Sequence, residues 1–217
     1  MNKTVALFGS TGLIGGEILK LLIDDDHYEA INVITRKKVN VKSKKIKNYI
    51  IDFSNPEDYK KVIKKGNIII ASIGTTQSKV NFNKTEYRKV DYDILLNIAK
   101  ACKTNQASSF CFVSSAGANE KSKNFYLGLK GEIENSIMQL GLKTCLIFRP
   151  SLLLGKRNEF RFGEIIAQKF MPIFSFLMKS EYKPIKAVDV AKSIVNECKK
   201  IVSGNKIYHY SEIKNLN

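Results

Sequence analysis

The chain has 217 residues, of which 44% are hydrophobic, so it can bury a sizeable core and we expect one domain over 1–217. No run of about eighteen apolar residues and no signal-peptide pattern occurs, which predicts a cytoplasmic protein without a membrane span. The formal charge is +16, but the lysines are spread along the whole chain, and this favours a compositional bias over specific nucleic-acid binding.

The cysteines and histidines indicate no metal site. The four cysteines form no CxxC pair, and His27 and His209 have no ligand-like neighbours. A catalytic cysteine would need a histidine base near it in the fold, and the sequence leaves that alternative open.

The first sixteen residues predict a strand, a tight turn and the start of a helix. The apolar run Val5–Phe8 stops at Gly9, and further glycines at 12, 15 and 16 precede an apolar-periodic stretch. Glycines let a backbone approach a pyrophosphate, and a helix N-terminus attracts anions. The spacing is G-x-x-G-x-x-G, which departs from the usual G-x-G-x-x-G, so a purely structural glycine turn is the alternative.

The second and third strands are predicted at Ala30–Thr35 and Ile46–Ile51. In NAD-specific folds an acidic residue at the end of the second strand holds the ribose 2′-hydroxyl, but Thr35 and Arg36 stand at that place here. A cation favours a 2′-phosphate, so the sequence predicts NADP (NADPH) as the cofactor, with Lys37 assisting. The alternative is a solvated basic loop.

Strands and helices continue to alternate after this point. A capping-box pattern at Ser54 predicts a helix over Asn55–Lys64, and a fully apolar strand follows at Ile68–Ile73. A helix is expected over Thr85–Lys103 and a strand over Phe110–Val113. This order predicts an α/β, Rossmann-type doubly wound parallel sheet with helices on both faces and a ligand crevice at the carboxyl ends of the strands.

Tyr126 and Lys130 are candidates for proton transfer. They are four residues apart on a helix predicted over Asn124–Leu140, so they lie on one face, one turn apart. An ammonium group near a phenol favours the phenolate form and makes the phenol a better proton donor near neutral pH. Alone, this spacing also describes a surface tyrosine beside a surface lysine.

Taken together, these motifs resemble the short-chain dehydrogenase/reductase superfamily. Within it the chain is similar to a compact, atypical branch that includes the Tat-interacting oxidoreductase-like and related NAD(P)H-binding proteins. The resemblance covers nearly the whole chain. It rests on Gly9 to Gly15, Ser72-Ile73-Gly74-Thr75-Thr76, Val90-Asp91-Tyr92, Val113-Ser114-Ser115, Tyr126-Leu127-Gly128-Leu129-Lys130-Gly131-Glu132 and Phe148-Arg149-Pro150-Ser151.

The resemblance implies a role for each matching residue. Ser115 would hydrogen-bond the substrate oxygen, Tyr126 would donate a proton to it, and Lys130 would bind the nicotinamide ribose while tuning Tyr126. Arg36 and Lys37 would hold the 2′-phosphate. The remaining cofactor contacts would come from Gly9, Thr11, Gly12, Leu13 and Ile14 at the pyrophosphate, Asp52 and Phe53 by the adenine, Ile73, Gly74 and Thr75 along the adenosine ribose and the route to the nicotinamide, and Pro150 and Ser151 beside the nicotinamide.

One position departs from the family. Many members carry an asparagine in the helix after strand four, where it completes a water-linked proton path, but Val90 is followed here by Asp91. That relay is therefore in doubt in this chain.

The family builds its substrate region beyond a sixth strand, predicted here at Thr144–Phe148, and the matching segment is 151–186. Phe160–Met178 within it is rich in aromatic and aliphatic residues, which is typical of core and pocket wall, of a self-association surface or of a membrane-touching segment. A penultimate helix is expected to run to about Ile201, followed by a short strand at Lys206–His209.

Two hypotheses for the function follow. The first is an NADP(H)-dependent oxidoreductase, a monomer or homodimer, that reduces a carbonyl of a small apolar or aromatic substrate. The second is an NADPH-binding regulator or scaffold with little or no turnover, which Asp91 and the lack of a distinct substrate domain favour. Sugar-nucleotide epimerase chemistry is less favoured because few residues remain after Pro150.

Overall fold

The computed structural model describes residues 3–155, 182–200 and 203–217, and a parallel seven-stranded sheet forms its centre. The strand order is β3-β2-β1-β4-β5-β6-β9, and β7 pairs with β8 in a separate small sheet. The strands are β1 (Thr4–Phe8), β2 (Ala30–Thr35), β3 (Ile46–Ile50), β4 (Ile68–Ala71), β5 (Ser109–Val113), β6 (Thr144–Phe148), β7 (Leu153–Leu154), β8 (Ile185–Lys186) and β9 (Gly204–Tyr208).

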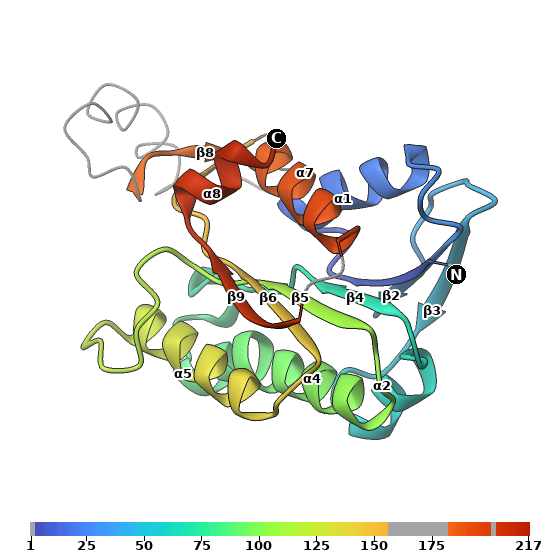
Figure 1. The fold of residues 1–217 in the computed structure, drawn as a ribbon. Helices are drawn as coiled ribbons and strands as arrows, with labels where there is room; N and C mark the ends of the chain where they lie inside the picture. The colour runs from blue at the N-terminus through green and yellow to red at the C-terminus, as the bar shows by residue number, and fades with distance from the viewer. Residues whose placement is uncertain (1–2, 156–181, 201–202) are drawn as a thin grey trace.

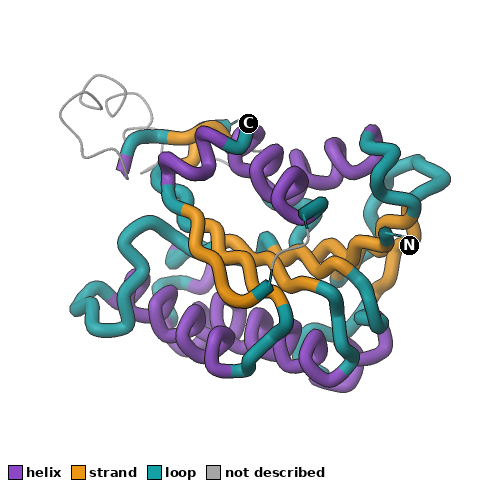
Figure 2. Tube along the Cα trace, in the orientation of Figure 1, coloured by secondary structure: helices purple, strands orange, loops and turns teal. Residues whose placement is uncertain are grey.

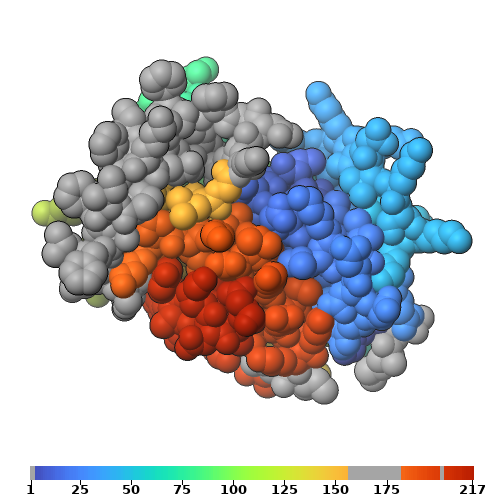
Figure 3. Space-filling view, turned by 90° about the horizontal axis from the view of Figure 1, so that it is seen from above, coloured from blue at the N-terminus to red at the C-terminus, as the bar shows by residue number. Residues whose placement is uncertain are grey.

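Helices cover both faces of the sheet, which gives three layers (Figure 1). The helices α1, α7 and α8 lie on one face, and α2, α4 and α5 lie on the other, as the helix and strand colours of Figure 2 also show. Seen from above, α1 lies directly beside α7 (Figure 3). The helices are α1 (Leu13–Asp24), α2 (Pro56–Val62), α3 (Lys84–Arg88), α4 (Ile94–Thr104), α5 (Phe125–Gln139), α7 (Ala187–Cys198) and α8 (Tyr210–Asn215), with a 3₁₀ turn η1 (Ser78–Val80) and a π turn η2 (Lys89–Asp93).

Two apolar clusters, one on each face of the sheet, form the core. Successive side chains of a strand point to opposite faces, so Leu7 packs under α1 and α7 while the adjacent Phe8 packs toward α2. The central strands are buried on both faces, which is why they appear in the sequence as continuous apolar runs. The buried Tyr28 hydroxyl donates to the Val195 carbonyl at 2.8 Å and ties the chain after α1 to α7.

The predicted α/β, doubly wound Rossmann-type sheet is confirmed. The strand order runs outward from β1 toward β3 on one side and from β4 toward β6 on the other, so the order reverses between β1 and β4. In such folds the ligand crevice lies at this point, outside the carboxyl ends of the strands. Within the described ranges no helix is long and apolar enough to cross a membrane.

Several predicted boundaries are wrong. The helix expected over Thr85–Lys103 is interrupted by the π turn, and the cap of α2 is Asn55, whose side chain accepts the Glu57 N–H, instead of Ser54. The strands β7 and β8 and the helix α8 were not predicted. The apolar segment Phe160–Met178 lies outside the described residues, so the predictions about it stay predictions.

Candidate functional site

The turn between β1 and α1 has glycines where any side chain would collide with the backbone. Gly9 has a φ of +84°, and a Cβ there would lie 2.3 Å from the carbonyl oxygen of Ser72, just beyond β4. A Cβ at Gly15 would lie 2.0 Å from the carbonyl oxygen of Gly9. These two glycines therefore let the start of α1 approach the carboxyl ends of β1 and β4 closely.

The N-terminus of α1 is suited to an anionic ligand. Its N-cap is Gly12, which has no side chain to cap the helix and is exposed together with Thr11. Leu13 is half-buried, and Ile14 is buried in the core, so Ile14 can offer a ligand only its backbone. Among the described residues, Ser10 carries the one buried side-chain polar atom without a hydrogen-bond partner. A buried hydroxyl is rarely left unpaired, which points to a ligand or water as its partner.

The basic residues Arg36 and Lys37 lie exposed beyond the carboxyl end of β2. Asn48 of β3, which sequence analysis did not single out, supports the chain on both sides of them. Its side-chain amide group donates to the Thr35 hydroxyl at 2.8 Å, and its side-chain oxygen accepts the Val39 N–H at 3.0 Å. Asn48 therefore fixes the short loop from which Arg36 projects.

Asp52 and Phe53 lie beyond β3, where the resemblance places the adenine. The Asp52 carboxylate accepts hydrogen bonds from the Ser54 hydroxyl and N–H at 2.7 and 2.8 Å, and these bonds lower the pKa of Asp52. The Phe53 ring packs edge-on against Phe8 and Tyr59, with centroids 6.3 and 5.9 Å apart. The Asp52 carboxylate is thus bonded within its own loop. The Phe53 ring forms an apolar surface at the margin of the core.

The structure brings Tyr126 and Lys130 together on α5. The Lys130 Nζ lies 5.8 Å from the centroid of the Tyr126 ring, and Lys130 is buried while Tyr126 is half-buried. Tyr87 of α3 packs edge-on against the same ring at 6.4 Å, and its hydroxyl donates to the Thr75 carbonyl at 3.2 Å. The Tyr126 ring therefore has two neighbours, the buried cation of Lys130 and Tyr87, which bonds the segment that follows β4.

That segment contains the predicted cofactor residues Ile73, Gly74 and Thr75. Ile73 and Thr75 are half-buried and Gly74 is exposed. The Thr75 N–H donates to the carboxylate of Asp91 at 2.7 Å. The segment is thereby held against the π turn, close to the helix that carries Tyr126.

Lys130 is paired with Asp91, which stands where the resemblance implied an asparagine. The Lys130 Nζ lies 2.8 Å from Asp91 Oδ1, and both side chains are almost fully buried. Burial alone would lower the pKa of Lys130, but the negative charge of Asp91 and of further groups outweighs it, and the net effect is to raise this pKa. Lys130 therefore stays protonated inside the protein.

A buried network beneath the site was missed by sequence analysis. Arg149 donates from Nε to the Glu134 carboxylate at 3.0 Å, and the Ser114 hydroxyl donates to the same carboxylate. The network joins β5, α5 and β6, and so fixes Ser115 and Pro150, which follow two of its members directly. A signal was present, because Glu134 lies one helical turn after Lys130 and on the same face.

Ser115, Pro150 and Ser151 lie at the carboxyl ends of β5 and β6. The Ser115 hydroxyl donates to the Ala116 carbonyl at 3.3 Å, and the Ala116 N–H donates to the Pro150 carbonyl at 2.9 Å. The Ser151 hydroxyl donates to the Lys183 carbonyl, which connects this edge to the segment leading into β8. The structure thus places all three at the edge where the crevice is expected.

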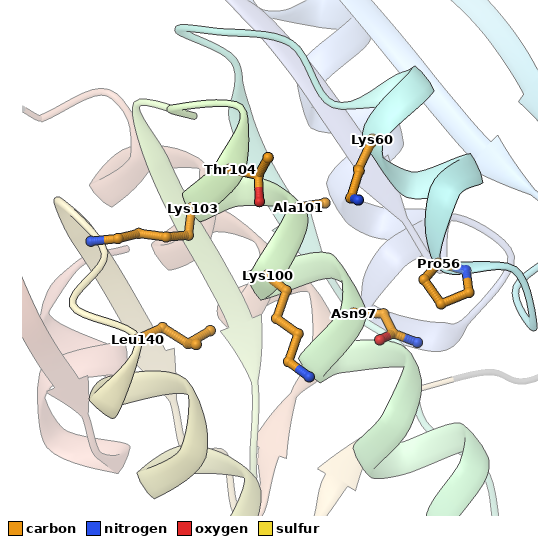
Figure 4. Close-up of a pocket in the computed structure, with 8 residues that line it drawn as sticks. All are labelled: Pro56, Lys60, Asn97, Lys100, Ala101, Lys103, Thr104 and Leu140. Carbon is orange, nitrogen blue, oxygen red and sulfur yellow. The ribbon is translucent and has the colours of Figure 1, made fainter.

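A separate hollow of about 450 Å³ lies between α2, α4 and the end of α5 (Figure 4). Lysines and small or apolar residues line it, and none of the predicted site residues is among them. The lining residues are Pro56, Lys60, Asn97, Lys100, Ala101, Lys103, Thr104 and Leu140.

Comparison with known proteins agrees with this geometry. Residues 9–144 match a protein-family model described as NAD(P)H-binding. The chain is 31% identical over 204 residues to the protein FMP52, mitochondrial, of Candida albicans, covering 91% of this chain and 89% of that protein. It is 28% identical over 198 residues to the protein HTATIP2 of Rattus norvegicus, covering 90% and 81%.

Solved structures share the fold at low sequence identity. The Bordetella bronchiseptica enzyme WbmH in complex with NAD+ superposes with a TM-score of 0.74 at 14% identity, covering 96% of this chain and 76% of that one. Vestitone reductase from alfalfa superposes with a TM-score of 0.65 at 20% identity, covering 94% and 75%. At these identities the likeness concerns the fold.

Proposed function

Because the chain belongs to this NAD(P)H-binding family, we propose that it is an oxidoreductase that uses NADPH to reduce a carbonyl group of a small apolar or aromatic substrate. The observation that carries the proposal is the half-buried phenol of Tyr126 beside the buried ammonium group of Lys130. A cation held next to a phenol prepares it to donate a proton to a carbonyl oxygen. A protein that only bound the cofactor would need Lys130 for the ribose but would have no need of the phenolic proton donor Tyr126.

The residues around the β1–α1 turn fit a dinucleotide. The collisions that a Cβ would cause at Gly9 and Gly15 show that the backbone packs too closely there for any other residue. The uncapped N-terminus of α1 and the unpaired hydroxyl of Ser10 offer N–H and O–H donors to a pyrophosphate. The bound cofactor would supply the hydride.

The protein's own residues would bind and orient the substrate and move the proton. Tyr126 would donate its phenolic proton to the carbonyl oxygen, and Ser115 would hydrogen-bond the same oxygen. Lys130 would bind the nicotinamide ribose and keep a positive charge beside the phenol. The network of Ser114, Glu134 and Arg149 supports this by fixing the backbone that carries Ser115.

The loop after β2 supports the proposed preference for NADPH. Arg36 and Lys37 are exposed there, and a guanidinium group binds phosphate with paired hydrogen bonds. An acidic residue, which would repel a 2′-phosphate, is absent from this loop between Thr35 and Lys45.

The second candidate is an NADPH-binding regulatory or scaffold protein with little or no turnover. One observation favours it: the Asp91 carboxylate lies against the Lys130 ammonium group and offsets the charge that would act on Tyr126. The two candidates share the cofactor site and differ only in whether Tyr126 transfers a proton.

A screen of NADPH oxidation against aldehydes, ketones and quinones tests the enzyme proposal. We expect turnover of at least one apolar or aromatic carbonyl compound, and we expect Tyr126→Phe to lower kcat by about 10²- to 10⁴-fold with cofactor affinity nearly unchanged.

Tyr210→Phe is the matched control for this screen. It also removes a single phenolic hydroxyl, from a half-buried position on α8, a helix that carries none of the predicted site residues. If NADPH binds but no compound is reduced, or if Tyr126→Phe is as active as the parent, the enzyme proposal is contradicted and the second candidate, an NADPH-binding regulatory or scaffold protein, is favoured.

A further inference from the structure

We propose that Asp91 is a positioning residue whose carboxylate holds the Lys130 ammonium group and the backbone after β4 together, and so sets where Lys130 meets the cofactor. The inference rests on the proposed function, because it concerns the same site. It assigns a specific role to the residue that stands where the family carries an asparagine.

Both oxygens of the carboxylate are engaged. Asp91 Oδ1 lies 2.8 Å from the Lys130 Nζ, and Oδ2 accepts the Thr75 N–H at 2.7 Å. The residue is only 1% exposed, and a Cβ added at Gly74 would lie 3.4 Å from Oδ1, so backbone packs closely on it as well. A carboxylate is this deeply buried only when charge and hydrogen bonds compensate it, and here both are present.

The π turn aims Asp91 at Lys130. The turn η2 lies between α3 and α4. Turns of this kind are rare in proteins, and those that occur are often found at functional sites. Two further contacts, from the residue that precedes the turn and from the turn itself, hold it against α5. Arg88 forms a paired salt bridge with Glu132, and the Tyr92 hydroxyl hydrogen-bonds Ser136.

An amide cannot replace this carboxylate. Lys130 and the Thr75 N–H are both donors, and the side chain of asparagine offers one acceptor oxygen and one donor group. In either orientation of the amide, one of the two contacts would place a donor against a donor. The asparagine of the family therefore cannot make both contacts, and the position requires Asp91 in this chain.

Asp91 also controls the charge of Lys130. The charged and titratable groups around Lys130 are Asp91, Tyr126 and Glu134. The Glu134 carboxylate is already bonded by Ser114 and Arg149, which leaves Asp91 as the carboxylate in direct contact. An ammonium group has three donors, so Lys130 can serve Asp91 and a cofactor hydroxyl at once.

The test is the pH dependence of NADPH affinity, measured by fluorescence titration of the full chain and of Asp91→Asn. Asp91 raises the pKa of Lys130, so its removal lets Lys130 lose its proton at lower pH. We expect Asp91→Asn to weaken binding about tenfold near neutral pH and to move the alkaline limb of the affinity profile down by about one pH unit or more.

Asp93→Asn is the matched control, because it removes the same charge from the same turn at an exposed position. We expect it to match the parent in both measurements. An Asp91→Asn profile identical to that of Asp93→Asn would overturn the proposal.

A conservative variant covers the case in which Asp91→Asn does not fold. Asp91→Glu keeps the negative charge with a longer side chain, so it should retain the alkaline limb of the parent but bind NADPH more weakly. Parent-like affinity in Asp91→Glu would overturn the positioning role. If the parent chain binds NADPH but reduces no carbonyl compound, the proposed reductase activity is contradicted and the test of Asp91 still applies. If the parent chain binds no NADPH, both the proposed activity and the proposed role of Asp91 are contradicted.

Discussion

The side chains that support the candidate site come from positions far apart in the sequence. Asn48 lies on β3 but braces the loop that carries Arg36, and Arg149 follows β6 but is bonded to Glu134 of α5. Tyr126 and Lys130 could be predicted from the sequence because four-residue spacing on a helix is a local property. The supporting contacts could not, since they depend on which strand ends the fold brings together.

The loop after β2 predicts the choice of cofactor. We expect titration calorimetry to show that NADPH binds more tightly than NADH, and that Arg36→Ala loses about 1.5 to 3 kcal/mol of NADPH binding, the range for a hydrogen bond to a charged group, with little change for NADH.

Two further variants of this region sharpen the measurement. Lys44→Ala removes an exposed charge from the same basic segment and should leave both affinities unchanged. Asn48→Ala should weaken NADPH binding because the loop loses its brace. Equal affinities for the two cofactors in the parent chain would show that Arg36 does not hold a 2′-phosphate.

The π turn is the element that the sequence pattern hid. Apolar periodicity through Thr85–Lys103 predicts a single helix, and the structure divides this stretch into α3, η2 and α4. A π turn occurs as a single-turn bulge within helical backbone, and the apolar residues on both sides of it still read as helical, so the pattern does not locate it. The sequence showed Asp91 as a departure from the resemblance, but it did not show that Asp91 pairs with Lys130.

A third buried carboxylate, after those of Asp91 and Glu134, gives α7 a testable dependence on pH. Glu197 in its last turn accepts a hydrogen bond from the Tyr208 hydroxyl of β9 at 2.5 Å and is paired with Lys200. Burial alone would raise the pKa of Glu197, but these partners outweigh it and the pKa lies below the ordinary value of 4.5. Its contribution to stability is therefore present above pH 4.5 and is lost as the pH falls through the lower folded value.

We expect Glu197→Gln to reduce the free energy of unfolding at neutral pH and to reduce its loss on acidification. Urea unfolding of both chains at several pH values from neutral to acid measures this. Glu29→Gln, at an exposed position just before β2, is the control that removes an equal charge. Parallel stability curves for the parent and Glu197→Gln would contradict the assignment.

The topology of the whole molecule followed from the sequence because strands and helices alternate up to β6, except between β2 and β3, which no helix separates. The position of β9 beside β6 did not follow from that alternation, and neither did the small β7–β8 sheet. Both arise from segments after residue 150, where the pattern weakens. The cytoplasmic location and the oligomeric state stay predictions.

The net charge of +16 belongs to the whole molecule and predicts its behaviour toward nucleic acids. Evenly distributed lysines attract polyanions without recognising sequence, so we expect binding to DNA or RNA to be weak and to disappear by about 0.2 M salt. Filter binding over a series of salt concentrations, with two unrelated sequences, measures this. Tight binding that persists at this salt concentration would contradict the compositional interpretation.

The pairing of β9 with β6 affects how the chain is made. Synthesis proceeds from the N-terminus, so Phe148 leaves the ribosome well before Gly204 does. Throughout that interval β6, whose five residues are all buried in the finished fold, has unpaired N–H and C=O groups along one edge. Two such edges can pair with each other, so we expect nascent chains that end between these two strands to aggregate more readily than the full chain.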